Sequence, residues 1–172
     1  MRRSGILLHV SSLPGRYGIG SFGREAYRFV DKLKKAKQSY WQILPLGPTS
    51  YGDSPYQSFS TFAGNPYFID LYEFIEEGLL TKKECDSVDF GNNPKKVDYK
   101  KLYEGRFELL HKAYERAKVY EDEAFQDFVY ENSKWIWDYA LFMSLKDYFN
   151  GEPFSAWPKD IRDRYDYSIN YY

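Results

Sequence analysis

The stretch "GILLHVSSLPGRYGIGSFGREAYRFVDKLKKAKQSYWQILPL", residues 5–46, decides how the fold begins. It opens with a short apolar run, Gly5–Val10, and closes with a second run, Tyr40–Leu46. Apolar runs bounded by turn formers are typical of strands that are covered on both faces, as in a parallel sheet. Between the runs, residues 24–37 carry apolar side chains at helical spacing and cations in the last turn. Strand, helix and strand predict a βαβ unit with a right-handed crossover.

The next segment, "YGDSPYQSFSTFAGNPYFIDL" at residues 51–71, is too irregular for a helix and too polar for a buried strand. It follows the second predicted strand, at the end where α/β folds place their ligands. Its rings can offer flat faces to sugar rings, and its polar groups can exchange hydrogen bonds with sugar hydroxyls. These rings are Tyr51, Tyr56, Phe59, Phe62 and Tyr67, and these polar groups are Asp53, Ser54, Gln57 and Ser58. The segment therefore predicts a sugar or polyol site.

The rest of the chain is predicted to be mainly helical. "TKKE" at Thr81–Glu84 is a capping-box signature. Residues 98–150 carry successive apolar stripes at helical spacing, and "NG" at 150–151 followed by Pro153 is a helix stop. Because two strands with open edges do not make a stable sheet, we expect the chain to be the beginning of a longer fold.

The bulk properties exclude several classes of function. Charged residues make up 28% of the chain and the net charge is −1, which gives no electrostatic reason to expect nucleic acid or an acidic membrane as partner. Cys85 is the single cysteine, so no internal disulfide is expected, and no Cys/His spacing indicates a metal site. The apolar run near the N-terminus is too short for a signal peptide, and we expect a cytoplasmic protein. We expect no cofactor.

Two other patterns suggest chemistry but have simpler explanations. His9 adjoins Ser11 and Ser12 without a G-x-S-x-G elbow, so we interpret it as a satisfied core or rim residue. The glycines of "GRYGIGSFG" spell G-x-G-x-x-G before a helix, as a dinucleotide site does. However, they lie some distance past the strand rather than in its tight turn. Nucleotide binding remains a minor alternative.

Asp53 and Asp70 are the carboxylates whose positions suit glycoside chemistry, which usually requires two. Asp53 lies in the turn-like "GDSP", where an Asp side chain normally caps its own backbone. Asp70 can cap a helix over Tyr72–Glu77. We favour these structural roles for both.

Three blocks resemble the N-terminal part of the 4-α-glucanotransferases, the amylomaltases of the α-amylase superfamily. They are "GILLHVSSLPGRYGIGSFG", "YWQILPLGPTSYGDSPYQSFSTFAGNPYFIDL" and "VDYKKLYEGR", and "FMSLKDYFNGEPFSAWPKDIRDR" resembles the family's next block. The resemblance implies an α/β fold, the N-terminal part of a (β/α)8 TIM barrel: its first two βα units with a mainly helical insertion subdomain. Residues 1–50 would form the first barrel strands and helix, residues 51–71 the substrate-cleft loop, and residues 72–172 the insertion.

The same resemblance implies a reaction and a set of binding residues. α-1,4-Glucan segments would pass between maltooligosaccharides by a retaining double displacement, with a glycosyl-aspartate intermediate and a glutamate acid–base. The loop Tyr51–Ser58 would line the cleft: Tyr56 would stack near the scissile bond, while Asp53 and Ser54 would shape the loop and position hydroxyls. Tyr51 and Tyr103 match two tyrosines of a secondary glucan-binding groove.

The match stops before the family's catalytic carboxylates, so no residue of this chain is predicted to be catalytic. The remainder of the barrel would be needed for a closed fold, and we expect the chain alone to be inactive and prone to aggregation. The alternatives are an α-glucan hydrolase of the same superfamily and a non-catalytic glucan-binding fragment.

Overall fold

The computed structural model describes residues 2–50 and 52–172 and divides the chain into two compact units. The first unit is Met1–Val119 and the second is Tyr120–Tyr172. This boundary falls inside the segment 72–172 that we expect to be an insertion in a barrel. That expectation concerns the complete barrel and stays a prediction.

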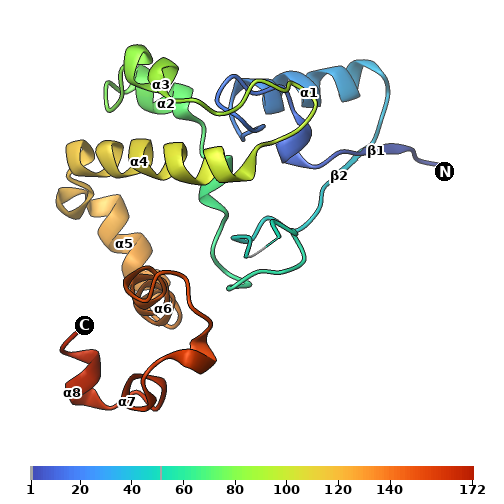
Figure 1. The fold of residues 1–172 in the computed structure, drawn as a ribbon. Helices are drawn as coiled ribbons and strands as arrows, with labels where there is room; N and C mark the ends of the chain where they lie inside the picture. The colour runs from blue at the N-terminus through green and yellow to red at the C-terminus, as the bar shows by residue number, and fades with distance from the viewer. Residues whose placement is uncertain (1, 51) are drawn as a thin grey trace. The chain divides into compact units, whose positions relative to one another are not determined.

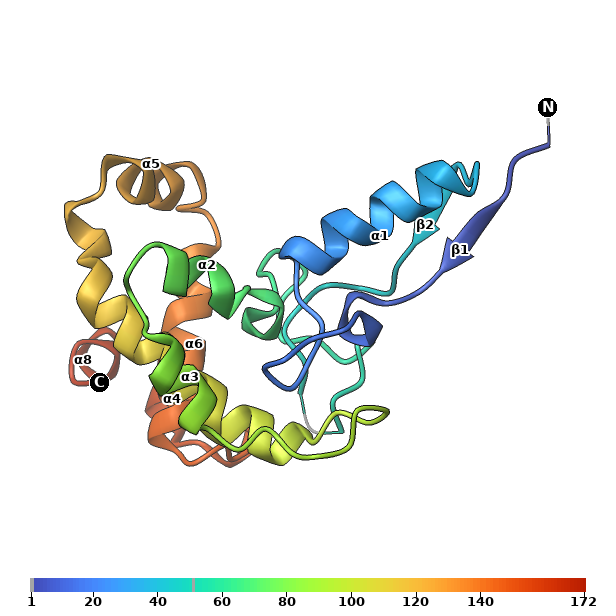
Figure 2. The same cartoon turned by 90° about the horizontal axis from the view of Figure 1, so that it is seen from above.

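The first unit begins with the predicted βαβ arrangement (Figure 1). Strand β1 is Gly5–Leu7, helix α1 is Arg24–Lys35 and strand β2 is Tyr40–Gln42. The strands pair in parallel, with Gly5 opposite Tyr40 and Leu7 opposite Gln42, which confirms the predicted pairing. Helix α1 runs alongside them (Figure 2), and its Phe29 ring lies 5.0 Å from the ring of Trp41, centroid to centroid.

Both strands are shorter and more exposed than predicted. The runs Gly5–Val10 and Tyr40–Leu46 were expected to be strands throughout, yet a 3₁₀ turn follows β1 at Val10–Ser12. The ladder ends because the Leu44 N–H donates to the His9 side chain, at Nδ1 and 3.3 Å, instead of to a facing carbonyl. The prediction that β1 is covered on both faces is also wrong for this chain, since Leu7 is 60% exposed. Within the described residues the sheet has two strands, so its faces and edges have few neighbours.

Three helices complete the first unit. They are α2 (Leu71–Glu76), α3 (Lys82–Ser87) and α4 (Tyr99–Ala117). The predicted capping box is present at the start of α3: Thr81 Oγ1 accepts from the Glu84 N–H, and the Glu84 carboxylate accepts from the Thr81 N–H. The apolar stripe of α4 is buried in one core with Val10, Leu71, Leu80 and Cys85; its fully buried members are Leu102, Leu109 and Ala113.

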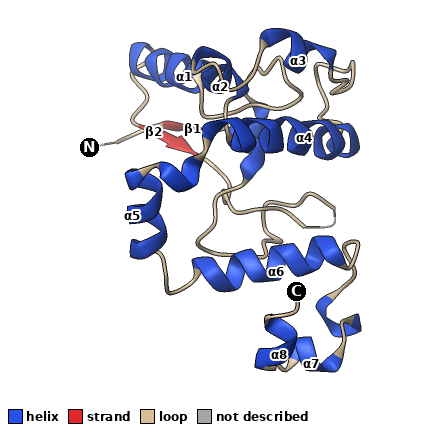
Figure 3. Ribbon diagram, turned by 90° about the vertical axis from the view of Figure 1, so that its left-hand side faces the viewer, coloured by secondary structure: helices blue, strands red, loops and turns tan. Residues whose placement is uncertain are grey.

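The second unit is helical, as predicted (Figure 3). It contains α5 (Glu123–Glu131), α6 (Ile136–Tyr148), α7 (Lys159–Arg162) and α8 (Asp166–Ile169). Helix α6 ends just before Asn150 and Gly151, which both have positive φ, so the predicted helix stop is confirmed. A small core of Leu145, Trp157 and Ile161 holds this unit together. In the described part of the chain, no helix has the length and apolar character that crossing a membrane requires.

Candidate glucan site

The loop after β2 is held by its own backbone hydrogen bonds. Thr49 and Ser58 form an antiparallel bridge, and the Ser50 N–H donates to the Gln57 carbonyl at 3.0 Å. The Asp53 N–H donates back to the Ser50 carbonyl at 3.0 Å, which closes a tight turn. The predicted irregular loop is thus a small folded hairpin, with Gln57 in its paired part and Asp53 in its turn. Tyr51 lies outside the described residues.

Serine hydroxyls organise this loop. The Tyr56 N–H donates to Ser54 Oγ at 3.3 Å, and Ser58 Oγ donates to the Ser60 carbonyl at 2.7 Å. Ser60 Oγ in turn accepts from the Phe62 N–H at 3.1 Å. These contacts are the local turns that short hydroxyl side chains typically make. Ser54 and Ser58 therefore have a structural role in this chain, whatever contact they also make with a ligand.

The rings of the loop have two different environments. Tyr56 and Phe62 are 72% and 70% exposed, as a ligand platform requires. Tyr67 is buried, so the expectation that it offers a face to a sugar is wrong. Its ring packs against Phe107 of α4, with centroids 5.8 Å apart, because the 3₁₀ turn Pro66–Phe68 directs it into the core.

Tyr67 is where the loop meets α4. Burial raises the pKa of Tyr67 to about 12, and the Asp53 carboxylate and the Tyr103 hydroxyl add to that shift. Asp53 of the loop and Tyr103 of the helix therefore lie near the same phenol. Tyr103 is 56% exposed, and its ring packs on Phe107 with centroids 5.1 Å apart. Asp53 and Tyr103, two predicted site residues far apart in sequence, thus both act electrostatically on Tyr67.

Of the structural roles that we favoured for Asp70 and Asp53, the structure shows the one for Asp70. Asp70 Oδ1 accepts from the Tyr72 N–H at 3.0 Å and caps α2, as predicted. Asp53 has a φ of 54° and is half-buried, and desolvation raises the pKa of its carboxyl group. The side-chain acceptor that folds back on this turn belongs to the neighbouring Ser54. Nothing in this arrangement places Asp53 and Asp70 as a paired acid and base.

The other candidate motifs are structural. His9 Nδ1 accepts the Leu44 N–H, its ring meets Phe68 edge-on at 5.3 Å, and burial lowers its pKa, so it is the satisfied residue that we predicted. Gly23 precedes α1, and a Cβ there would lie 1.3 Å from Asp70 Oδ2. This glycine makes room for a carboxylate of the same chain, which disfavours a phosphate cradle.

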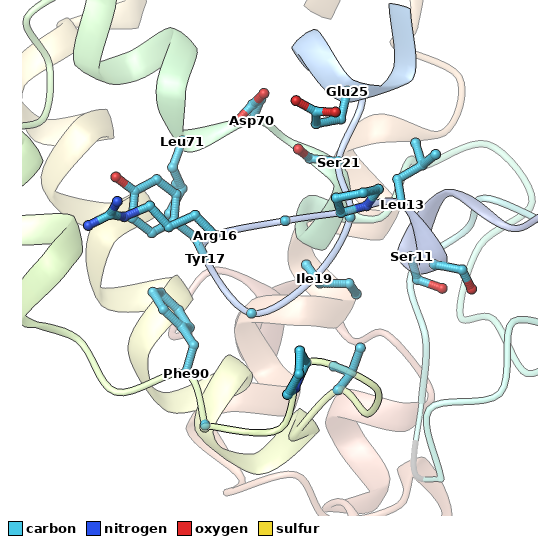
Figure 4. A pocket seen from close by; sticks show the side chains of 18 of the residues that line it. Ser11, Leu13, Arg16, Tyr17, Ile19, Ser21, Glu25, Asp70, Leu71 and Phe90 are labelled. Atoms are coloured by element: carbon cyan, nitrogen blue, oxygen red, sulfur yellow. The ribbon is translucent and has the colours of Figure 1, made fainter. Parts of the chain in front are cut away.

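A cavity of about 1150 Å³ lies elsewhere in the first unit, between the glycine-rich segment, α2 and residues 90–97. Glu25, Ser21 and Asp70 face it (Figure 4). Its three described arginines from residues 16–28 are each paired with a carboxylate: Arg16 with Asp86, Arg24 with Glu76 and Arg28 with Glu25. Of the loop residues predicted to bind sugar, none that the structure describes lines this cavity, so cavity size alone does not locate the glucan site.

Sequence reasoning missed Arg106. It is 1% exposed in α4, and Nη1 and Nη2 donate to the carbonyls of Tyr17 and Ile69. The helical pattern does not predict that Arg106 is buried, because a long cationic side chain next to an apolar stripe usually extends into solvent.

Comparison with known proteins is consistent with this geometry. The family model described as 4-alpha-glucanotransferase matches residues 8–172. A 4-alpha-glucanotransferase of Clostridium butyricum is 52% identical over 165 residues, which are 96% of this chain and 34% of that protein. One from Thermus thermophilus is 48% identical over 167 residues, covering 95% of this chain and 32% of that protein.

A solved structure gives the same result. The amylomaltase from Streptococcus agalactiae in complex with acarbose superposes with a TM-score of 0.91 at 43% identity. The match covers 99% of this chain and 35% of that structure. The chain therefore spans about a third of the length of the relatives it matches.

Proposed function

Since the chain belongs to the 4-alpha-glucanotransferase family, we propose that it supplies the opening part of a (β/α)8 barrel and one wall of a glucan cleft. Parallel pairing of β1 and β2 around α1 supports the first two βα units of such a barrel. The exposed strands support it as well, because barrel strands need neighbours on both edges. Helices α2 to α8 would then belong to the insertion.

The reaction that we propose for the complete barrel is transfer of α-1,4-glucan segments between maltooligosaccharides with retention of configuration. A retaining mechanism needs a nucleophilic carboxylate and a second carboxyl group about 5 Å away. We assign neither to this chain, because Asp70 caps α2 and nothing in the structure places Asp53 beside it as a second carboxyl group. The contribution of residues 52–58 would be to bind and orient the donor and acceptor sugars.

The exposed ring of Tyr56 is the observation that carries this proposal. A ring that is 72% exposed on a hydrogen-bonded hairpin is fixed by its backbone yet open to a ligand. Stacking such a ring on the apolar face of a glucose residue gains free energy without ordering a flexible segment. Gln57 and Ser58, both exposed on the same hairpin, would supply hydrogen bonds to the sugar hydroxyls.

We further propose a secondary glucan groove at Tyr103, with Tyr51 as the second ring. Tyr103 is supported by its exposure and by its contact with Phe107, which holds the ring at the helix surface. Binding of an α-glucan in this groove would not need a catalytic carboxylate, so the chain could bind glucan there without being active.

Maltotriose disproportionation by the 172-residue chain tests the assignment of catalytic groups. We expect neither glucose nor longer maltooligosaccharides to form. Formation of both in step would contradict the proposal that the catalytic carboxylates lie elsewhere in the barrel, and release of glucose alone would favour a hydrolase.

Calorimetric titration with maltoheptaose and with acarbose tests the binding surface. We expect Tyr56→Ala and Tyr103→Ala each to weaken binding by about tenfold, the loss that one stacked ring typically causes. Tyr114→Ala is the matched control, because Tyr114 is a similarly exposed tyrosine farther along α4. Equal binding by all three variants and the unsubstituted chain would overturn the proposed site.

A further inference from the structure

Arg106 is a cation inside the core of the first unit. It is 1% exposed, and burial lowers the pKa of its guanidinium to about 10, so it stays charged at neutral pH. Nη1 donates to the Tyr17 carbonyl at 3.3 Å and Nη2 donates to the Ile69 carbonyl. Its Nε is buried and, among the described residues, has no hydrogen-bond partner. A buried charge with an unsatisfied donor is a costly way to stabilise a core.

The two carbonyls belong to different segments that meet at α4. Tyr17 lies in the glycine-rich segment before α1, and Ile69 is near the end of the loop at residues 51–71. The carboxylate of the adjacent Asp70 favours the charged guanidinium, which opposes the effect of burial. One side chain of α4 therefore binds both the end of the proposed cleft loop, at Ile69, and the glycine-rich segment before α1, at Tyr17.

Residues next to Arg106 in α4 connect its contacts to the proposed groove at Tyr103. Gly105 permits a close approach of α4, since a Cβ there would lie 2.2 Å from Val88 Cγ1. Phe107 contacts both Tyr67 of the loop and Tyr103 of the helix. Tyr103 lies one helical turn before Arg106 and Phe107, so any shift of α4 against the loop moves its ring.

We propose that Arg106 is a positioning residue for glucan binding, which fixes α4 and its Tyr103 against the loop that carries Tyr56. This inference rests on the proposed function of the two rings. A ring that is already held in place, in the cleft or in the secondary groove, binds a glucan without first ordering the protein, and that saving appears directly as affinity. Arg106 does not touch the sugar; it acts through the backbone at Ile69 and through the helix that bears Tyr103.

An Arg106→Met variant separates positioning from stabilisation. Methionine fills much of the same space. Removing the buried charge offsets the cost of leaving the Tyr17 and Ile69 carbonyls without these donors, so we expect only a small change in melting temperature. We also expect about tenfold weaker binding of maltoheptaose, and faster amide hydrogen exchange at residues 65–70 and 99–103. Arg116→Met is the matched control on the same helix: its guanidinium pairs with Glu84 and the Leu79 carbonyl, and glucan binding should not change.

Each combination of results has a distinct meaning. A lower melting temperature with unchanged affinity and exchange would overturn the proposal and make Arg106 a stabilising residue only. If the unsubstituted chain binds no glucan, the proposed function fails, while hydrogen exchange still decides whether Arg106 holds the loop on α4. If Arg106→Met does not fold, Arg106→Lys keeps the charge and the reach to one carbonyl; we expect it to fold with intermediate affinity, and affinity equal to that of the unsubstituted chain would count against positioning.

Discussion

Tyr56 and Tyr67 lie in the same loop, yet one faces solvent and the other is buried. Strands and helices have a period that tells which side chains face the core, but an irregular loop has none. The direction of each ring is set by the turn that carries it: the hairpin tip for Tyr56 and the 3₁₀ turn at Pro66–Phe68 for Tyr67. At this scale the sequence predicts that rings are available, and the turns decide which of them can meet a ligand.

Asp53 gives a pH-dependent prediction at the residue scale. Burial raises the pKa of its carboxyl group above the ordinary value of 3.8, so the folded protein holds this proton more tightly than the unfolded chain does. Ionised Asp53 therefore reduces the free energy of unfolding as the pH rises through its folded pKa. We expect Asp53→Asn to stabilise the chain at neutral pH and to have no effect well below pH 3.8.

Thermal unfolding followed by circular dichroism at both pH values tests this prediction. Asparagine is a suitable replacement because, like aspartate, it tolerates the positive φ of 54° at this position. Destabilisation at neutral pH would mean that the carboxylate makes a favourable contact that outweighs its burial.

At the scale of elements, helix starts follow from local chemistry. Asp70, Thr81 and Asp98 each accept a hydrogen bond from a backbone N–H in the first turn of α2, α3 and α4. Such caps act over a few residues, so a sequence pattern is enough to find them. The strands behave differently, because the length of a strand depends on the backbone groups that face it. Both strands stop early where the Leu44 N–H donates to the His9 side chain instead of to a backbone carbonyl.

The capping box of α3 gives a prediction at this scale. Thr81→Ala removes the acceptor for the Glu84 N–H, and we expect it to lower the free energy of unfolding by about 1 kcal/mol. In a domain of this size that loss lowers the melting temperature by about 2–4 °C. Thr81→Ser keeps the hydroxyl and should retain most of the stability, whereas an equal loss in both variants would show that the methyl group matters and the cap does not.

At the scale of the whole molecule, the two-stranded sheet is the weak point. Ile6 and Leu7 are 42% and 60% exposed on a strand whose free edge can pair with another chain. Closure of the proposed barrel would cover these side chains and pair the free strand edges. The chain alone is therefore expected to be marginally stable and to self-associate.

Light scattering of the purified chain tests this expectation. We expect Leu7→Lys to reduce association, because a lysine on an edge strand discourages strand pairing. Val30→Lys is the control, since Val30 is also exposed but lies on α1. A chain that stays monomeric at every concentration measured, or equal association by Leu7→Lys and the unsubstituted chain, would contradict the prediction.

Sequence patterns were enough to predict the strand–helix–strand order at the start of the first unit, the caps at Asp70 and Thr81, and the family. Each of these depends on neighbours within a few residues or on motifs that can be read letter by letter. Packing between distant segments places Tyr67 in the core, sets Phe107 against both Tyr67 and Tyr103, and brings two backbone carbonyls to the buried Arg106. Burial and long-range contacts depend on which segments pack together, such as Arg106 with Tyr17 across 89 residues, and no local pattern encodes that packing.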